Sequence, residues 1–124
     1  MIGNPTDEQR GLYDAVARAQ LAGVETVRAG VEARTIDAAC RDALADDALA
    51  EAFVHGAGHG IGLEIHEQPI LAARTNEAVR AGYVVTVEPG VYVPGVGGVR
   101  IEDSVVVTDR GCQTITKTPK DPVV

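Results

Sequence analysis

The chain of 124 residues is long enough for one domain with a single modest core, and its two cysteines, Cys40 and Cys112, have neither metal-site nor redox spacing. Asp and Glu outnumber Lys and Arg by 18 to 11, which argues against a nucleic-acid partner because no basic stripe is available to displace counterions. No apolar run approaches the roughly 20 residues that cross a bilayer, and the N-terminus does not resemble a leader, so a soluble, cytoplasmic protein without a membrane partner is expected.

Two helices are predicted within the first 50 residues. The first begins after Thr6, whose side chain can form a capping box with Gln9, and Gly30 is predicted to be its C-cap. The second begins near Thr35 and fades in the acidic stretch at 46–47.

Short extended runs separated by glycine and proline turns are predicted in the rest of the chain. They are expected at 53–54, 83–88, 91–93 and 99–108, with turn residues at 89–90 and 94–98. Helices followed by antiparallel strands predict an α+β fold.

Side-chain alternation in two of these runs predicts a shared pocket. A period of two places Glu102 with Arg100 on the face opposite Ile101, and the same rule places Glu88 with Thr86. If the two strands pair across the intervening turns, both carboxylates can face one pocket, and charges beside apolar runs need a partner or a metal.

All three histidines, His55, His59 and His66, lie within twelve residues and alternate with four glycines. Any one of them alone is more often a satisfied surface or core group. Three together indicate a site, because glycine permits close approach and imidazole is the usual metal ligand and proton carrier. One histidine combined with carboxylates makes an oxygen-rich site that suits Mn²⁺ or another divalent ion.

Three linked motifs carry a resemblance to a known family. HGAGHGIGLEIHE from residue 55, TVEPG from residue 86 and GVRIED from residue 98 resemble, in order and spacing, the Xaa-Pro dipeptidases (prolidases) and Xaa-Pro aminopeptidases. These form the proline-directed branch of the pita-bread metallopeptidases, and the resemblance covers nearly the whole chain. It implies that residues 1–124 are the C-terminal half of the catalytic domain and form the second half of the pita-bread fold.

The resemblance also implies a metal site. Carried over residue by residue, His59 and Glu88 would bind one metal, and Glu102 would bridge both ions of a dinuclear centre. Mn²⁺ is the expected metal, with Co²⁺ and Zn²⁺ as alternatives.

The remaining site residues are implied in the same way. His66 would contact the scissile carbonyl, His55 would line the proline-side pocket, and Arg100 would orient the neighbouring carboxylates. For Arg100 a surface strand arginine is the alternative. The implied reaction is metal-assisted hydrolysis of the peptide bond before proline, without a covalent nucleophile.

Two departures from the family pattern set further expectations. Ala57 replaces a larger residue of many relatives, a small change. More seriously, the family's two metal-binding aspartates lie upstream of the first helix, and the aspartates at 7, 14, 37, 42, 46 and 47 are expected to cap helices or face solvent. The chain is therefore expected to be a fragment with a partial metal site and little or no activity alone.

The missing half of the fold predicts an uncovered apolar face. Such a face predicts a homodimer or higher oligomer. A non-catalytic pita-bread module that binds peptides or protein partners is the alternative function.

Overall fold

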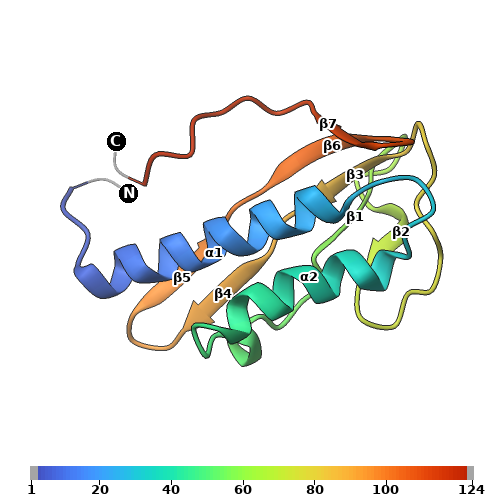
Figure 1. Ribbon diagram of the computed structural model, residues 1–124. Coiled ribbons are helices and arrows are strands. Elements are labelled where there is room, and N and C mark those ends of the chain that lie inside the picture. The colour runs from blue at the N-terminus through green and yellow to red at the C-terminus, as the bar shows by residue number, and fades with distance from the viewer. Residues whose placement is uncertain (1–2, 123–124) are drawn as a thin grey trace.

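The computed structural model describes residues 3–122, in which two helices precede a series of antiparallel strands (Figure 1). The elements in chain order are α1 (Asp7–Thr26), α2 (Ala33–Ala45), the short 3₁₀ helix η1 (Ala50–Ala52), β1 (Gly58–Gly60), β2 (Glu67–Leu71), β3 (Val84–Val87), β4 (Gly90–Val93), β5 (Gly97–Arg100), β6 (Asp103–Thr108) and β7 (Gly111–Thr114). The predicted α+β class is confirmed. No helix within residues 3–122 has both the length and the apolar character that a bilayer-spanning segment needs.

The start of α1 was predicted correctly and its end was not. Thr6 and Gln9 form the capping box, with the Thr6 hydroxyl accepting from the Gln9 amide. The helix stops at Thr26 because Val27 turns to an extended conformation and is fully buried. Gly30, the predicted C-cap, has a φ of +86° and donates its amide to the carbonyl of Val79, so it serves the connection between the helices.

The second helix starts at Ala33, two residues before the predicted start at Thr35. The residue before it makes no side-chain cap. Instead, the amides of Ala33 and Arg34 donate to the carbonyls of Glu77 and Thr75, in a loop far along the chain. Tertiary contacts therefore satisfy the amides that a capping side chain would otherwise satisfy.

Strands β3 to β6 form one long, interrupted hairpin. β3 pairs with β6 and β4 pairs with β5, so the predicted strand at 99–108 is divided in two. Val87 lies opposite Asp103 and Gly90 lies opposite Arg100, which means that one register runs through both pairs. The interruption falls at 88–89 and 101–102.

Three strands were not predicted, and one predicted extended run forms no strand. β1 lies inside the histidine-rich segment, β2 follows it, and β7 pairs with β6, giving the sheet order β2-β1-β3-β6-β7. Phe53 is extended, but it only ends η1. The glycines at 58 and 60 concealed β1 because glycine weakens the usual strand pattern.

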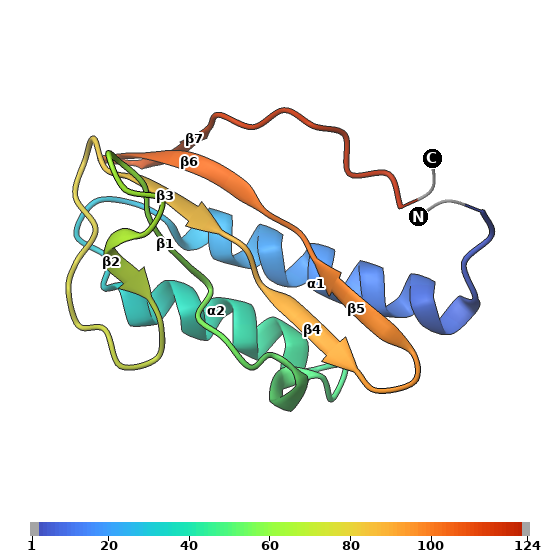
Figure 2. The ribbon, with the colours of Figure 1, turned by 180° about the vertical axis from the view of Figure 1, so that it is seen from behind.

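Both helices pack on one face of the strands, and the view from behind shows the opposite face without a covering helix (Figure 2). The two helices and β3 approach closely at Gly23, where an added Cβ would lie 2.6 Å from the Cys40 sulfur and 2.8 Å from a Val87 methyl. The fully buried side chains of this core include Val16, Val27, Ile36, Leu44, Leu71, Val79, Val85, Val87, Val91, Val105 and Val107.

A buried carboxylate ties the C-terminal segment to α1. Asp103 accepts hydrogen bonds from Gln20 (2.8 Å), Thr116 (2.6 Å) and Lys120 (2.9 Å), and the Tyr13 hydroxyl donates to the Lys120 carbonyl at 2.7 Å. Burial raises the pKa of Asp103, but the hydrogen bonds from these donors outweigh burial, so the pKa lies below its ordinary value of 3.8.

Candidate metal centre

Five of the six predicted site residues meet at a cleft of about 230 Å³, and Glu102 is the exception. Its walls come from the loop before β1, from β1 itself, from the junction of β3 and β4, and from the end of β5. The lining residues are His55, Gly56, Gly58, His59, His66, Ile70, Glu88 and Arg100.

The His59 side chain on β1 is oriented so that one ring nitrogen points at a carboxylate. Its Nδ1 lies 2.9 Å from the Gly60 carbonyl, which can only accept, so Nδ1 carries the proton. Nε2 then lies 3.1 Å from Oε1 of Glu88. In neutral imidazole this nitrogen is an acceptor, and two acceptors at that distance need a proton or a cation between them.

Glu88 is held by contacts to both its backbone and its side chain. The Thr86 hydroxyl donates to Oε1 at 2.9 Å, and the Glu88 amide donates to the Ala57 carbonyl at 2.7 Å. Arg100 Nη1 lies 3.6 Å from Oε2. The carboxylate therefore has a fixed direction toward His59, as a ligand with supporting hydrogen bonds does.

Glu102 does not join this pair. The common register of the hairpin places it opposite Glu88, at the interruption between β5 and β6. Its side chain is exposed, however, and it is absent from the cleft lining. Across residues 3–122, no three His, Cys, Asp or Glu side chains form a group that could hold a metal ion.

The donors fit a divalent ion in kind but not in number. An imidazole nitrogen and a carboxylate oxygen suit Mn²⁺, Zn²⁺ or a similar ion. Two donors are in place, whereas a protein metal site usually has three or more ligands. The predicted convergence is thus found for His59 and Glu88 and not for Glu102.

His66 and His55 lie on either side of the His59–Glu88 pair. The His66 ring is exposed, and its centroid lies 4.3 Å from that of His59. His55 Nδ1 lies 2.8 Å from the Gly56 carbonyl, so Nε2 is free to accept from Arg100 Nη2 at 3.2 Å. Arg100 lies near Glu88, one of the carboxylates that it was expected to orient, and the contact with His55 was not predicted.

Sequence reasoning also missed an ion pair next to the cleft whose carboxylate is buried. Asp37, expected to cap a helix or face solvent, is fully buried on α2 and pairs with Arg41 at 2.7 Å. It also accepts from the Ala57 amide at 3.0 Å. The spacing of four residues could have indicated the pair, but its burial depends on the loop that folds over it.

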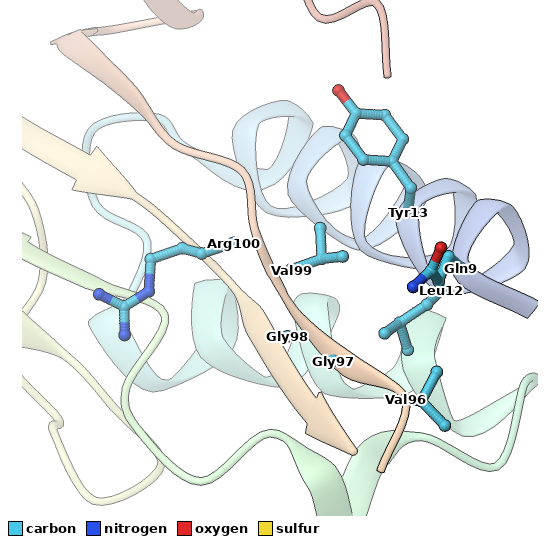
Figure 3. A pocket seen from close by; sticks show the side chains of 8 residues that line it. All are labelled: Gln9, Leu12, Tyr13, Val96, Gly97, Gly98, Val99 and Arg100. Carbon is cyan, nitrogen blue, oxygen red and sulfur yellow. The ribbon is translucent and has the colours of Figure 1, made fainter. Parts of the chain in front are cut away.

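A second cavity, of about 350 Å³, lies between α1 and β5 (Figure 3). Gln9, Leu12 and Tyr13 of α1 line it together with 96–100. Arg100 lines both cavities, but Figure 3 shows its side chain pointing away from Gln9, Leu12 and Tyr13. The larger cavity has none of the histidines or the carboxylate of the metal cleft.

A histidine nitrogen and a carboxylate oxygen are ligand types that metal-dependent hydrolases use. The chain belongs to metallopeptidase family M24, which it matches over residues 1–109. Among solved structures it is similar to an Xaa-Pro dipeptidase from Bacillus anthracis, with a TM-score of 0.96 and 48% identity over 99% of this chain and 35% of that one.

Two further relatives belong to the same group. An X-Pro aminopeptidase from Thermotoga maritima has a TM-score of 0.94 and 38% identity, over 99% of this chain and 35% of that one. The Xaa-Pro dipeptidase of Pyrococcus furiosus is 39% identical over 98% of this chain and 35% of its own length. The chain has the pita-bread architecture of these proteins, and it spans about a third of their length.

Proposed function

We propose that residues 1–124 are the C-terminal half of the catalytic domain of a proline-specific metallopeptidase, an Xaa-Pro dipeptidase or aminopeptidase. The observation that carries the proposal is the pair of His59 Nε2 and Glu88 Oε1, 3.1 Å apart with the histidine tautomer set by a carbonyl. The relatives named above support the substrate class, a peptide with proline in its second position.

In this proposal His59, Glu88 and Glu102 are the ligands that this chain contributes. Mn²⁺ is the preferred ion, with Co²⁺ and Zn²⁺ as alternatives, because the set is rich in oxygen. A divalent ion, when bound, supplies Lewis acidity toward the peptide carbonyl and lowers the pKa of water. Glu102 would reach the site by a side-chain movement, for which its exposed position leaves room.

The other cleft residues orient these ligands and the substrate. The Gly60 carbonyl accepts from Nδ1 of His59 and so turns Nε2 toward Glu88, and the Thr86 hydroxyl fixes the Glu88 carboxylate. His66, exposed beside His59, is placed to donate a hydrogen bond to the scissile carbonyl. His55 and Arg100 form the wall on the other side of Glu88 and would contact the proline end of the peptide.

The chain alone is expected to bind metal weakly and to hydrolyse peptides poorly. Two donors are in place and a third is near, while the family's dinuclear centre needs the further aspartate pair that the resemblance implies. Those carboxylates would come from another segment facing the cleft.

We also propose that the sheet face opposite the helices associates with a second copy of the chain. This face has no covering helix (Figure 2), and the loop after β1 exposes the apolar side chains of Leu63 and Ile65. Sedimentation at micromolar concentration tests this, and a monomer would contradict it.

The main test is Mn²⁺ binding by titration calorimetry, followed by hydrolysis of Ala-Pro and Gly-Pro peptides. His59→Ala should abolish binding, whereas His66→Ala, the matched control, should bind the ion normally and lose only hydrolysis. A wild-type chain that binds no Mn²⁺ at millimolar concentration would refute the proposal. If that chain still bound peptides, the non-catalytic module would be favoured instead.

A further inference from the structure

We infer that Asp37 and Arg41 of α2 are positioning residues that set the orientation of His55 and the location of Glu88 at the cleft. The inference deepens the proposed function and rests on it for the roles of those two groups. The contacts that carry it are independent of any metal.

Asp37 is the fixed point of the arrangement. Its side chain is fully buried, and both of its oxygens have hydrogen-bond donors. Oδ2 accepts from Arg41 Nε at 2.7 Å, and Oδ1 accepts from the Ala57 amide at 3.0 Å. A buried carboxylate with this many charge-assisted contacts has little freedom to move.

Arg41 extends the arrangement into the loop before β1. Its Nη1 donates to the Phe53 carbonyl and its Nη2 to the His55 carbonyl, both at 2.8 Å. The guanidinium also lies over the Phe53 ring, 4.3 Å from the centroid. One planar group therefore fixes two carbonyls, one ring and one carboxylate, which the single nitrogen of lysine cannot do.

Two routes lead from this pair to the cleft. Along the first, the Ala57 amide donates to Asp37 at 3.0 Å and also to the Leu71 carbonyl at 2.7 Å, and the Ala57 carbonyl accepts from the Glu88 amide at 2.7 Å. Along the second, the Phe53 ring held by Arg41 packs edge-on against His55, with centroids 4.9 Å apart.

The second route ends at Nε2 of His55, which faces Arg100. Arg41 is 31% exposed, and a partly buried ion pair contributes little net stability compared with apolar residues of the same size, so stability alone does not account for the pair. The positioning of His55 and Glu88 does account for the Asp37–Arg41 pair.

The test uses long-range ¹H–¹⁵N spectra of the metal-free chain, in which the three histidines give three imidazole patterns. In wild type, His55 should show the Nδ1-protonated tautomer, and the His59 pattern is the reference within the same spectrum. Arg41→Lys keeps the charge for Asp37 but removes the fork, so the His55 pattern should change to a mixture of tautomers while that of His59 stays the same.

Arg18→Lys is the matched control. Arg18 forms an exposed ion pair with Asp47 at 2.7 Å, away from the cleft residues, and its replacement should leave all three patterns unchanged. A wild-type His55 pattern in Arg41→Lys would overturn the inference. A lower stability of Arg41→Lys with an unchanged His55 pattern would also overturn the inference.

A second variant protects the test against loss of folding. Asp37→Asn keeps an oxygen for the Ala57 amide and removes the charge that holds Arg41, so it should change the His55 pattern in the same direction. Mn²⁺ affinity of Arg41→Lys should also fall, by about tenfold, as expected when the support of a ligand is lost. If wild type binds no Mn²⁺, the proposed function fails, but the imidazole spectra still decide the positioning role.

Discussion

The Thr86 hydroxyl contacts both Glu88 and the backbone of His59, so its removal tests how far the cleft depends on it. It donates to Glu88 at 2.9 Å and accepts from the His59 amide at 3.0 Å. Thr86→Val replaces the hydroxyl by a methyl of similar volume, so no cavity is created. What is lost is these two hydrogen bonds and a longer contact of 3.4 Å to the His59 carbonyl.

The magnitude follows from what is left without a partner. The side chain of Thr86 is buried, so water does not readily replace the hydroxyl at the His59 amide. A buried donor left unsatisfied costs about 1–3 kcal/mol, and Glu88 loses a charge-assisted bond as well, although its side chain keeps some access to water. We expect Thr86→Val to lower the free energy of unfolding of the metal-free chain by about 2 kcal/mol.

Urea unfolding followed by circular dichroism measures this loss, and Mn²⁺ titration provides a second measurement. Thr86→Ser keeps the hydroxyl and removes a methyl, which costs about 0.8 kcal/mol, and it should bind Mn²⁺ as wild type does. Thr86→Val should bind Mn²⁺ about 10–100-fold more weakly. Stability and affinity of Thr86→Val equal to those of Thr86→Ser would refute this account of the site.

Three other outcomes are expected. Gly58→Ala should destabilise the chain by about 3 kcal/mol or more, because the new Cβ would lie 2.0 Å from the Thr86 carbonyl oxygen. Gly11→Ala, in an open position of α1, should stabilise it by about 0.5–1 kcal/mol. Equal urea midpoints of the two variants would contradict this. The pKa of Asp103 is lowered in the folded chain, so its contribution to stability is present above its ordinary value of 3.8 and is lost as the pH falls through the lower folded value. Asp103→Asn should flatten stability against pH in that acid range, and an unchanged profile would exclude the contribution. Burial, with the charge of a neighbouring carboxylate, raises the pKa of Cys40 to about 12. Iodoacetamide at pH 8 should therefore not modify Cys40 until urea unfolds the chain. Modification of the folded chain as fast as that of the unfolded chain would count against the burial of this thiol.

The sequence predicted local features of the fold well where short-range chemistry decides them. The capping box of Thr6 is an example, since both of its partners lie within one helical turn. Gly30 shows the opposite case, because the choice between ending a helix and forming a later turn depends on the burial of Val27 in the core. The start of α2 likewise depends on the carbonyls of Thr75 and Glu77, which accept from its first amides and which local sequence cannot show.

The same limit applies to the cleft. Strand alternation correctly placed Glu88 with Thr86, and a hydrogen bond joins their side chains. It could not show that the strand at 99–108 is interrupted. The interruption leaves Glu102 exposed between the β3–β6 pair and the β4–β5 pair. Asp37 was expected to cap a helix or face solvent because aspartates on helices usually do, and only the folded loop over α2 reverses that expectation.

The shared register of the long hairpin limits how this segment can change in length. Glu88 and Glu102 are separated along the chain by β4, a short turn and β5, and Ile101 donates to the Pro89 carbonyl across the interruption. An insertion of one residue in either arm would turn one carboxylate to the other face of the sheet. Length variation is therefore compatible with the site only in the turn at 94–96, or when both arms change together.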